Sequence, residues 1–207
     1  MNRLEWMTSN SRLTEIAPIF DRRLELKFAA PRVGIPELEE ALSTSFTREF
    51  PTRSVHSIYF DTPGLLLFEE AEEGINPRMK YRVRWYDDAK DSLAIEIKQS
   101  ESLSRLKSVH HLPVGSEMPT HLHTRRGLLA PVALVSYRRE YFSSERGRLT
   151  IDNNVTTTVL RNGRTQHHRM SVAEFKTPFH AASVNADYAR IFTTDRFSKY
   201  SLALYTD

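Results

Sequence analysis

Charged and apolar residues alternate along many short segments of this chain, and turn residues separate these segments. Such alternation predicts β-strands, because successive side chains of a strand point to opposite faces of the sheet. The predicted strands are Arg23–Ala29, Val55–Phe60, Arg78–Tyr86, Leu93–Gln99, Val132–Phe142, Arg148–Asp152, Thr156–Leu160 and Val172–Thr177. Helical patterns are fewer and predict helices over Pro36–Ser45, Pro119–Leu129 and Val184–Phe192. The pattern as a whole favours an α+β fold that is mainly β.

The polar faces of the predicted strands are almost wholly charged. The segment Arg78–Tyr86 carries cations on one face, at Arg78, Lys80, Arg82 and Arg84. Its other face carries apolar side chains, at Met79, Tyr81, Val83 and Trp85. A half-buried sheet with its polar face in water explains alternation in any single strand. Four successive cations, however, repel one another unless an anion neutralises them, so this face is predicted to bind a ligand with several negative charges.

The spacing Glu-x-Lys occurs three times, at Glu25–Lys27, Glu96–Lys98 and Glu174–Lys176. Residues two apart share a face of a strand, so each pair places a carboxylate beside an ammonium group. The carboxylate can hold a divalent metal ion while the lysine binds a phosphate oxygen. About eight strands suffice to enclose a small ligand when a sheet closes into a barrel. We therefore expect a closed antiparallel barrel with its charged face inward, binding a polyphosphate-type anion together with a metal ion.

Composition sets limits on this prediction. The chain has 207 residues, 40% of them hydrophobic, with no repeat and no Gly-rich or Pro-rich linker, so residues 1–207 are expected to form a single domain. No apolar run approaches the roughly 18–20 residues of a membrane span. The N-terminus has no apolar signal segment and the chain has no cysteine, which together favour a cytoplasmic location. The net charge of +3 does not by itself indicate nucleic-acid binding.

An ordered set of short motifs resembles a known family. The motifs are Ser57-Ile-Tyr-Phe-Asp-Thr62, Arg78-x-Lys80-x-Arg82-x-Arg84-Trp85-Tyr86, Glu96-Ile-Lys98, Ser136-Tyr-Arg138-Arg, Arg148-Leu-Thr-Ile-Asp152, Glu174-Phe-Lys176 and Phe197-Ser-Lys199-Tyr-Ser. Together they resemble the VTC-type polyphosphate polymerase domain, within the triphosphate tunnel metalloenzyme (CYTH-like) superfamily, from about Arg23 to Leu204. The superfamily's N-terminal signature is often Glu-x-Glu-x-Lys, whereas Arg23 stands at the first acidic position here, which favours the VTC type over ordinary triphosphatases.

The resemblance implies a fold and a set of site residues. The fold is an eight-stranded antiparallel tunnel barrel with flanking helices. The residues implied to face the phosphates are Lys27, Arg82, Arg84, Lys98, Lys107, Arg138, Arg148 and Lys199, of which all but Lys107 are also expected to act in catalysis. The strand pattern adds Arg78, Lys80 and Lys176 as substrate-binding residues. Glu174 is the implied ligand of Mn²⁺ or Mg²⁺, with Glu25 and Glu96 as further metal ligands.

Three functions are compatible with this site. The first is metal-dependent phosphoryl transfer, with synthesis of polyphosphate from ATP or another triphosphate. The second is hydrolysis of an inorganic or nucleoside triphosphate, in which Glu25 or Glu96 could act as the base for water. The third is a binding module without turnover. RNA is not the expected ligand, because Tyr81, Trp85 and Phe175 fall on the face opposite the cations, where bases could not stack beside bound phosphates.

Three other features are expected to be structural. Asp61 begins the turn sequence Asp-Thr-Pro-Gly and is expected to be a turn or hydrogen-bonding residue. The segment Leu65–Phe68 is too short for a membrane anchor and is expected to pack or to form an exposed lip. Asp152 has the parity of Arg148 and is expected to pair with an interior cation rather than bind metal.

Overall fold

The computed structural model describes residues 19–20, 23–31, 40, 46–101, 104–145, 147–178 and 197–205; for residues 19–31, 104–105 and 177–178 within these ranges it describes the backbone. The strands are β1 (Ile19–Phe20), β2 (Arg23–Pro31), β3 (Thr47–Asp61), β4 (Arg78–Tyr86), β5 (Ala94–Glu101), β6 (Ser104–His111), β7 (Leu122–Thr124), β8 (Gly127–Ser144), β9 (Gly147–Val159), β10 (Arg164–His167) and β11 (Met170–Pro178). The helices are α2 (Leu66–Glu73) and α4 (Lys199–Tyr205).

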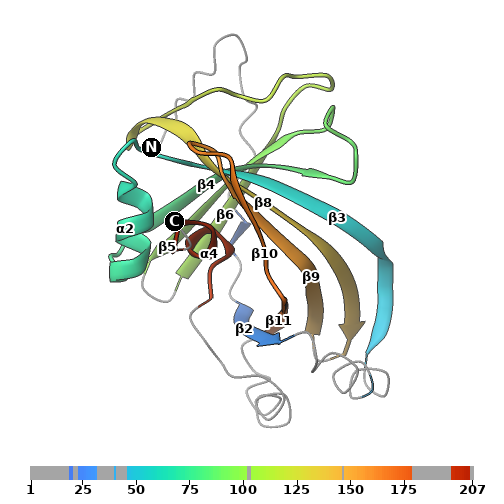
Figure 1. Cartoon of the computed structure of the whole chain (residues 1–207). Helices are drawn as coiled ribbons and strands as arrows, with labels where there is room; N and C mark the ends of the chain where they lie inside the picture. Colours follow the sequence, from blue (N-terminus) through green and yellow to red (C-terminus); the bar gives the residue numbers. More distant parts are fainter. Residues whose placement is uncertain are drawn as a thin grey trace.

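All described strands belong to one sheet, in which every neighbouring pair is antiparallel (Figure 1). The order is β1-β6-β5-β4-β3-β8-β9-β11-β2, with β7 beside β8 and β10 beside β9. Eight strands have eight or more residues, and β1, β7 and β10 are shorter. The mainly β, antiparallel fold is therefore as predicted, and neither of the two helices in the described part is long and apolar enough to cross a membrane.

The closed barrel is not confirmed, because the described sheet runs from β1 at one edge to β2 at the other. The two edges are nevertheless close at one point. β1 ends at Phe20 and β2 begins at Arg23, so three Cα–Cα steps of about 3.8 Å join them and these two residues lie at most about 11 Å apart. The sheet thus curves far enough for the end of β1 and the start of β2, which are its two edge strands, to lie close together.

Some predicted elements differ from the structure. The segments 148–152 and 156–160 belong largely to a single strand, β9, interrupted by a bulge at Asn154, whose φ of 54° is left-handed. The predicted helix Pro119–Leu129 is wrong, because the segment forms β7 and the start of β8 around a turn at Gly127, whose φ is 100°. The predicted helices at 36–45 and 184–192 lie outside the described residues apart from Glu40, which is helical. β6 and both described helices were not predicted.

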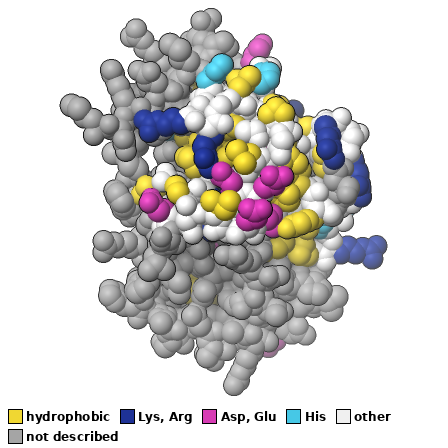
Figure 2. Space-filling view, turned by 90° about the vertical axis from the view of Figure 1, so that its left-hand side faces the viewer, with side chains coloured by type: hydrophobic (Ala, Val, Ile, Leu, Met, Phe, Trp, Pro, Cys, Tyr) yellow, Lys and Arg dark blue, Asp and Glu magenta, His cyan; other side chains and the backbone are white. Residues whose placement is uncertain are grey.

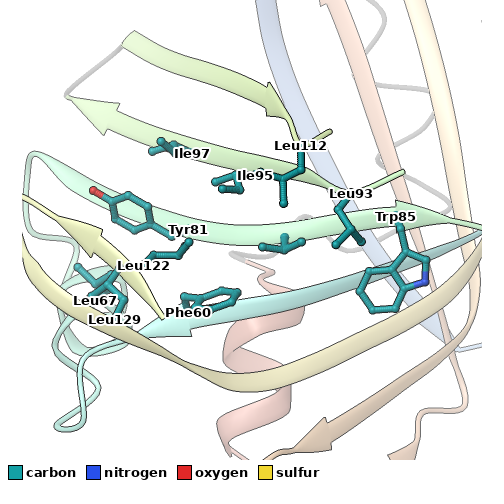
Figure 3. Packing of buried hydrophobic residues seen from close by; sticks show 11 residues of the cluster. Phe60, Leu67, Tyr81, Trp85, Leu93, Ile95, Ile97, Leu112, Leu122 and Leu129 are labelled. Carbon is teal, nitrogen blue, oxygen red and sulfur yellow. The ribbon is translucent and has the colours of Figure 1, made fainter. Parts of the chain in front are cut away.

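The apolar face of the sheet, which carries Tyr81, Val83 and Trp85 of β4, forms the larger part of the core. Its buried partners are Phe60, Leu67, Leu93, Ile95, Ile97, Leu112, Leu122 and Leu129 (Figure 3). Leu67 comes from α2 and Leu122 from β7, so these two elements cover this face. Full burial of such side chains stabilises the fold by about 1.5–3 kcal/mol each. The alternation in β4 therefore directs its cations to the opposite face.

Asp61 fixes α2 against the end of β3. Its carboxylate is fully buried and accepts hydrogen bonds from the backbone N–H groups of Leu67 and Phe68, both at 2.9 Å. It also accepts one from the Tyr200 hydroxyl at 2.6 Å. The carboxylate thus satisfies donors in the first turn of α2 and holds α4 as well. The structural role expected for Asp61 is confirmed, and the segment Leu65–Phe68 turns out to begin α2.

α4 lies against β8 and β9, on the face of the sheet opposite the apolar face (Figure 1). Tyr200 stacks on Tyr59 of β3, with ring centroids 4.8 Å apart and an interplanar angle of 10°. Tyr200 and Ala203 are buried there with Val135 of β8. This apolar contact brings Lys199, the first residue of α4, to the same face as the cations of β4.

Candidate anion-binding site

Charged side chains from seven elements converge on the face that α4 partly covers, which we call the charged face. Its charged members with described side chains are Lys80, Arg82, Arg84, Glu96, Lys98, Lys107, Arg139, Asp152, Glu174, Lys176 and Lys199. The cross-strand register brings them together, since Arg82 is the Cα partner of Glu96 and Lys98 is the partner of both Lys80 and Lys107. Cations outnumber carboxylates in this set, so the face is strongly electropositive.

Three cations surround the Glu96 carboxylate, which is 5% exposed. Arg82 donates from Nε at 2.7 Å, Lys107 donates from Nζ at 2.8 Å, and Arg84 Nη1 lies 3.5 Å away. Burial alone would raise the pKa of Glu96, but these three cations outweigh it and hold that pKa well below its usual range. Both oxygens of an ionised Glu96 are thus engaged by cations. Glu96 is therefore the shared counter-anion of Arg82, Arg84 and Lys107.

Arg84 is held in a fixed orientation by neutral groups. Its side chain is 5% exposed, and it donates from Nε to Ser57 Oγ at 3.0 Å and from Nη2 to the Tyr137 hydroxyl at 3.0 Å. Neither partner neutralises the guanidinium charge. Arginine presents its donors in a rigid planar fork that matches phosphate oxygens. Arg84 therefore combines a fixed position with a positive charge that is only partly compensated.

A second charged group is centred on Asp152, which is fully buried. Arg139 binds its carboxylate with both Nε, at 2.6 Å, and Nη2, at 2.8 Å, and Lys199 Nζ lies 2.6 Å away. Burial opposes ionisation, but the two cations lower the pKa of Asp152 below its ordinary value. The predicted pairing of Asp152 with an interior cation is confirmed. Tyr137 links the two groups, because its hydroxyl binds Arg84 and its ring lies 4.8 Å from Lys199 Nζ.

Glu174 is a third carboxylate of this face. Its side chain is 13% exposed, and two of its ion pairs, with Arg139 and Lys176, span 3.7 and 3.8 Å. On the neighbouring strand β2, Lys27 is the Cα partner of Glu174 and Glu25 is the partner of Lys176, so two Glu-x-Lys pairs interleave on one face. No cluster of three or more acidic or histidine ligands occurs among the described residues. One or two carboxylates completed by phosphate oxygens are, however, the usual environment of Mg²⁺.

The structure places several predicted residues away from the two charged groups. Arg148 shares the face of Asp152 but lies at its rim, where its side chain is 63% exposed and 3.6 Å from Glu49. Arg78 also lies at a rim, where it donates to Asn76 at 3.3 Å. Lys176 is 41% exposed, and Lys80 binds Ser198 Oγ at 2.8 Å beside α4.

Among the predicted site residues whose side chains the structure describes, Arg138 lies on the opposite face of the sheet. It is exposed, and its neighbours Tyr137 and Arg139 both contact Lys199 or Asp152 on the charged face. Adjacent side chains on a strand point to opposite faces, so Arg138 points away from the site. Arg139 points toward the charged face instead. Its spacing of two residues from Tyr137 was the sequence signal that these two side chains share a face.

Four tyrosines also lie on the charged face, namely Tyr59, Tyr86, Tyr137 and Tyr141. In the sequence, only the aromatic residues of the apolar face were considered as stacking surfaces. Tyr59 lies directly opposite Arg82 and accepts a hydrogen bond from its Nη1 at 3.1 Å. Burial alone would raise the pKa of Tyr59, but Arg82, Arg84 and Lys80 outweigh it and lower that pKa to about 8. The lowered pKa of this hydroxyl therefore indicates a positive electrostatic potential at the site.

We expect Tyr59 to titrate near pH 8, below the ordinary range of a tyrosine. An ultraviolet titration of tyrosinate absorbance should show one transition near pH 8 in the wild type and none near pH 8 in Tyr59→Phe. The control variant Tyr205→Phe, which keeps Tyr59, should still show this transition. Because the folded pKa is lowered from 10 to about 8, the folded state loses this proton first, and stability should rise as pH increases between these values, by up to about 3 kcal/mol. A first tyrosine transition near pH 10 would contradict the positive potential inferred here.

The outer surface on the side of α2 is acidic by contrast. Glu69, Glu72 and Glu73 of α2 are exposed, and Figure 2 shows acidic side chains gathered among hydrophobic ones on this side. An anionic ligand is repelled here and attracted to the charged face. The two surfaces therefore favour ligands of opposite charge.

Comparison with known proteins agrees with this geometry. The model of the VTC domain family matches residues 5–114. No curated protein matches the chain. Among solved structures, the chain is similar to HpAC1 of Hippeastrum, an adenylyl cyclase candidate with a dominant triphosphatase activity, with a TM-score of 0.56 and 14% identity over 89% of this chain and 96% of that one. It is also similar to the PH1819 protein of Pyrococcus horikoshii OT3, with a TM-score of 0.50 and 15% identity over 88% of this chain and 96% of that one. At these identities the two structures show a shared fold.

Proposed function

This chain belongs to the VTC domain family, and on that premise we propose that it is a phosphotransferase whose charged face binds a triphosphate, with polyphosphate synthesis from ATP as its reaction. The proposal includes a single VTC-like domain over residues 1–207 and a closed tunnel formed by the eight long strands. The closeness of Phe20 and Arg23, at the two edges of the sheet, supports that closure.

The observation that carries the proposal is the excess of cations around the buried carboxylate of Glu96. Arg82, Arg84 and Lys107, whose side chains are 23%, 5% and 44% exposed, share this one carboxylate, and grouping cations so closely is costly unless further negative charge accompanies them. A phosphate chain supplies several negative charges in a row. Its oxygens can accept from the guanidinium groups bidentately and from lysines as point charges.

In the proposed reaction, the terminal oxygen of a phosphate chain attacks the γ-phosphorus of ATP. The bond from this phosphorus to the β,γ-bridging oxygen breaks, ADP leaves, and the chain grows by one unit. Arg82, Arg84 and Arg139 hold the phosphates in line and stabilise the charge of the transition state, so no protein nucleophile is required. A divalent ion, Mn²⁺ or Mg²⁺, held by Glu174 with Glu25 would add positive charge beside the phosphate oxygens.

Triphosphate hydrolysis is the second candidate, favoured by the triphosphatase activity named for the structurally similar Hippeastrum protein. It uses the same phosphate contacts with water as the acceptor. Glu96 is poorly suited to act as its base, because three cations keep it ionised and occupied. Glu25 is the remaining carboxylate that the sequence analysis assigned to that role.

The deciding experiment incubates the purified protein with ATP and Mn²⁺ or Mg²⁺, separates phosphate chains on a gel and measures free phosphate. Long chains with ADP are the expected products. Free phosphate without chains would replace synthesis by hydrolysis. Absence of turnover, with inorganic tripolyphosphate still raising the melting temperature, would leave a binding module.

We expect Glu174→Ala to abolish product formation while leaving metal-free tripolyphosphate binding largely intact, because the carboxylate holds the metal rather than the phosphates. The readouts are the gel assay and calorimetric titration of tripolyphosphate. Glu69→Ala, on the exposed acidic side of α2, is the matched control and should keep full activity. Wild-type turnover by Glu174→Ala would rule out its role as metal ligand.

A further inference from the structure

The charged face continues into a group of aromatic and arginine side chains, formed by Phe50, Arg53, Tyr86 and Tyr141, which we call the aromatic group. Tyr86 ends β4 and lies opposite Val55 of β3, whereas Phe50 and Tyr141 are Cα partners in β3 and β8. The position of each follows from a residue already placed on the charged face. Tyr86 is two residues beyond Arg84, and Tyr141 is two residues beyond Arg139.

The members of this group contact one another and remain accessible. The Arg53 guanidinium lies 5.9 Å from the centre of the Tyr86 ring. Phe50 and Tyr141 pack edge to face, with centroids 5.9 Å apart and an interplanar angle of 90°. Burial raises the pKa of Tyr141, and the nearby cations Arg139 and Arg53 oppose that shift. Phe50 is 48% exposed and Tyr86 is 36% exposed, so both rings present a surface to a ligand.

Arg53 adds a further argument for a ligand at this position. It is the Cα partner of Arg139 across β3 and β8, and like charges directly opposite each other on one face are destabilising. Asp152 and Glu174 lie near Arg139, whereas Arg53 extends toward Tyr86. A phosphate between the two arginines would relieve this repulsion.

The spacing suits a nucleotide. Tyr86 lies about 6.6 Å along its strand from Arg84, at a rise of about 3.3 Å per residue. Such a separation leaves room for a ribose between a phosphate bound by the arginines and a base at the rings. Aromatic rings and guanidinium planes are the usual surfaces on which proteins stack bases, and an exposed ring next to an anion site offers such a surface.

We propose that the aromatic group is a base-binding subsite, in which Tyr86 and Arg53 stack the base of a nucleoside triphosphate whose phosphates occupy the charged face. The inference rests on the proposed function and adds to it the place where the base of the nucleoside triphosphate binds. Stacking on a ring face tolerates different bases, with purines favoured by their larger area. The subsite is thus expected to distinguish ligands that carry a base from ligands that carry none.

The test is calorimetric titration of two ligands, a non-hydrolysable ATP analogue and inorganic tripolyphosphate, against the full chain and its variants. Tyr86→Ala should weaken binding of the analogue roughly five- to a hundredfold and change tripolyphosphate binding less than twofold. Tyr86→Phe retains the ring and should bind both ligands as the wild type does. Tyr205→Ala, which removes a 65% exposed ring near α2, is the control and should leave both affinities unchanged.

The outcomes separate this inference from the proposed function. If Tyr86→Ala weakens both ligands equally, or weakens neither, the subsite is wrong while the anion site stands. If the wild type binds tripolyphosphate as tightly as the analogue, the base contributes nothing and the inference is again overturned. If the wild type binds neither ligand, the proposed function fails together with it. Melting temperatures of all variants establish that a lost affinity is not a lost fold.

Discussion

Replacing Arg84 with alanine is expected to lower turnover roughly tenfold to a thousandfold, or about 1.4–4 kcal/mol of transition-state stabilisation. The reason is its fixed position. Arg84 is buried, and Ser57 and Tyr137 orient its donors without neutralising its charge. Such a group needs no reorganisation when charge develops on a transferring phosphoryl group. The measurement is the initial rate of ADP release from ATP, with kcat and kcat/KM determined separately.

Two further variants make this prediction specific. Arg84→Lys keeps the charge but loses the planar fork, so its rate should fall between those of the wild type and Arg84→Ala. Arg138→Ala removes an arginine that β8 directs to the opposite face, and its rate should stay within about twofold of the wild type on that account. Equal effects at Arg84 and Arg138 would mean that the two faces of the sheet do not differ in function, and an unchanged rate in Arg84→Ala would remove its proposed role.

The contrast between Arg138 and Arg139 shows how far alternation alone could predict this site. In β4 the cations and apolar residues alternate without interruption, and Lys80, Arg82 and Arg84 lie where that pattern placed them. In β8 two arginines are adjacent, so charge by itself does not indicate which one points inward. The parity of Tyr137 resolves this, but only once the partner Asp152 is known to lie on the same face.

Contacts between strands that are distant in sequence could not be predicted from the sequence, for a similar reason. The Glu-x-Lys pattern placed Glu96 beside Lys98 of its own strand, whereas the ion pairs that Glu96 makes in the structure come from β4 and β6. The cross-strand register decides these partners, and bulges shift it locally, as at Asn154 of β9. β6 itself was not predicted. Its alternation is irregular, and its place in the sheet depends on pairing with β5.

α4 was also beyond prediction, because a seven-residue segment has too few positions to establish a helical period. Its helix is stabilised by tertiary contacts, namely the stacking of Tyr200 on Tyr59 and the hydrogen bond from Tyr200 to Asp61. The family resemblance nevertheless indicated that Lys199 belongs to the charged face. The structure explains this placement, since α4 brings Lys199 within 2.6 Å of Asp152.

Removing the carboxylate at Asp152 is expected to produce the largest loss of stability, about 3–5 kcal/mol. The side chain is fully buried and neutralises both Arg139 and Lys199. Asp152→Ala leaves these cations close together without their counter-charge. Urea denaturation followed by circular dichroism measures the change, and for a chain of this length the melting temperature should fall by about 6–20 °C. Arg48→Ala, which breaks an exposed ion pair with Glu140, is the control and should cost less than about 1 kcal/mol.

The same variant distinguishes a purely structural carboxylate from one that occupies the position of a ligand charge. If Asp152 offsets cations that otherwise bind phosphate, Asp152→Ala should bind inorganic tripolyphosphate more tightly than the wild type. Saturating ligand at about 100 times its Kd stabilises a folded protein by about 2.7 kcal/mol, so a fixed tripolyphosphate concentration should then raise the melting temperature of the variant more than that of the wild type. An equal or smaller increase would show that the phosphates do not reach Arg139 and Lys199. In that event the anion site would be confined to the cations around Glu96.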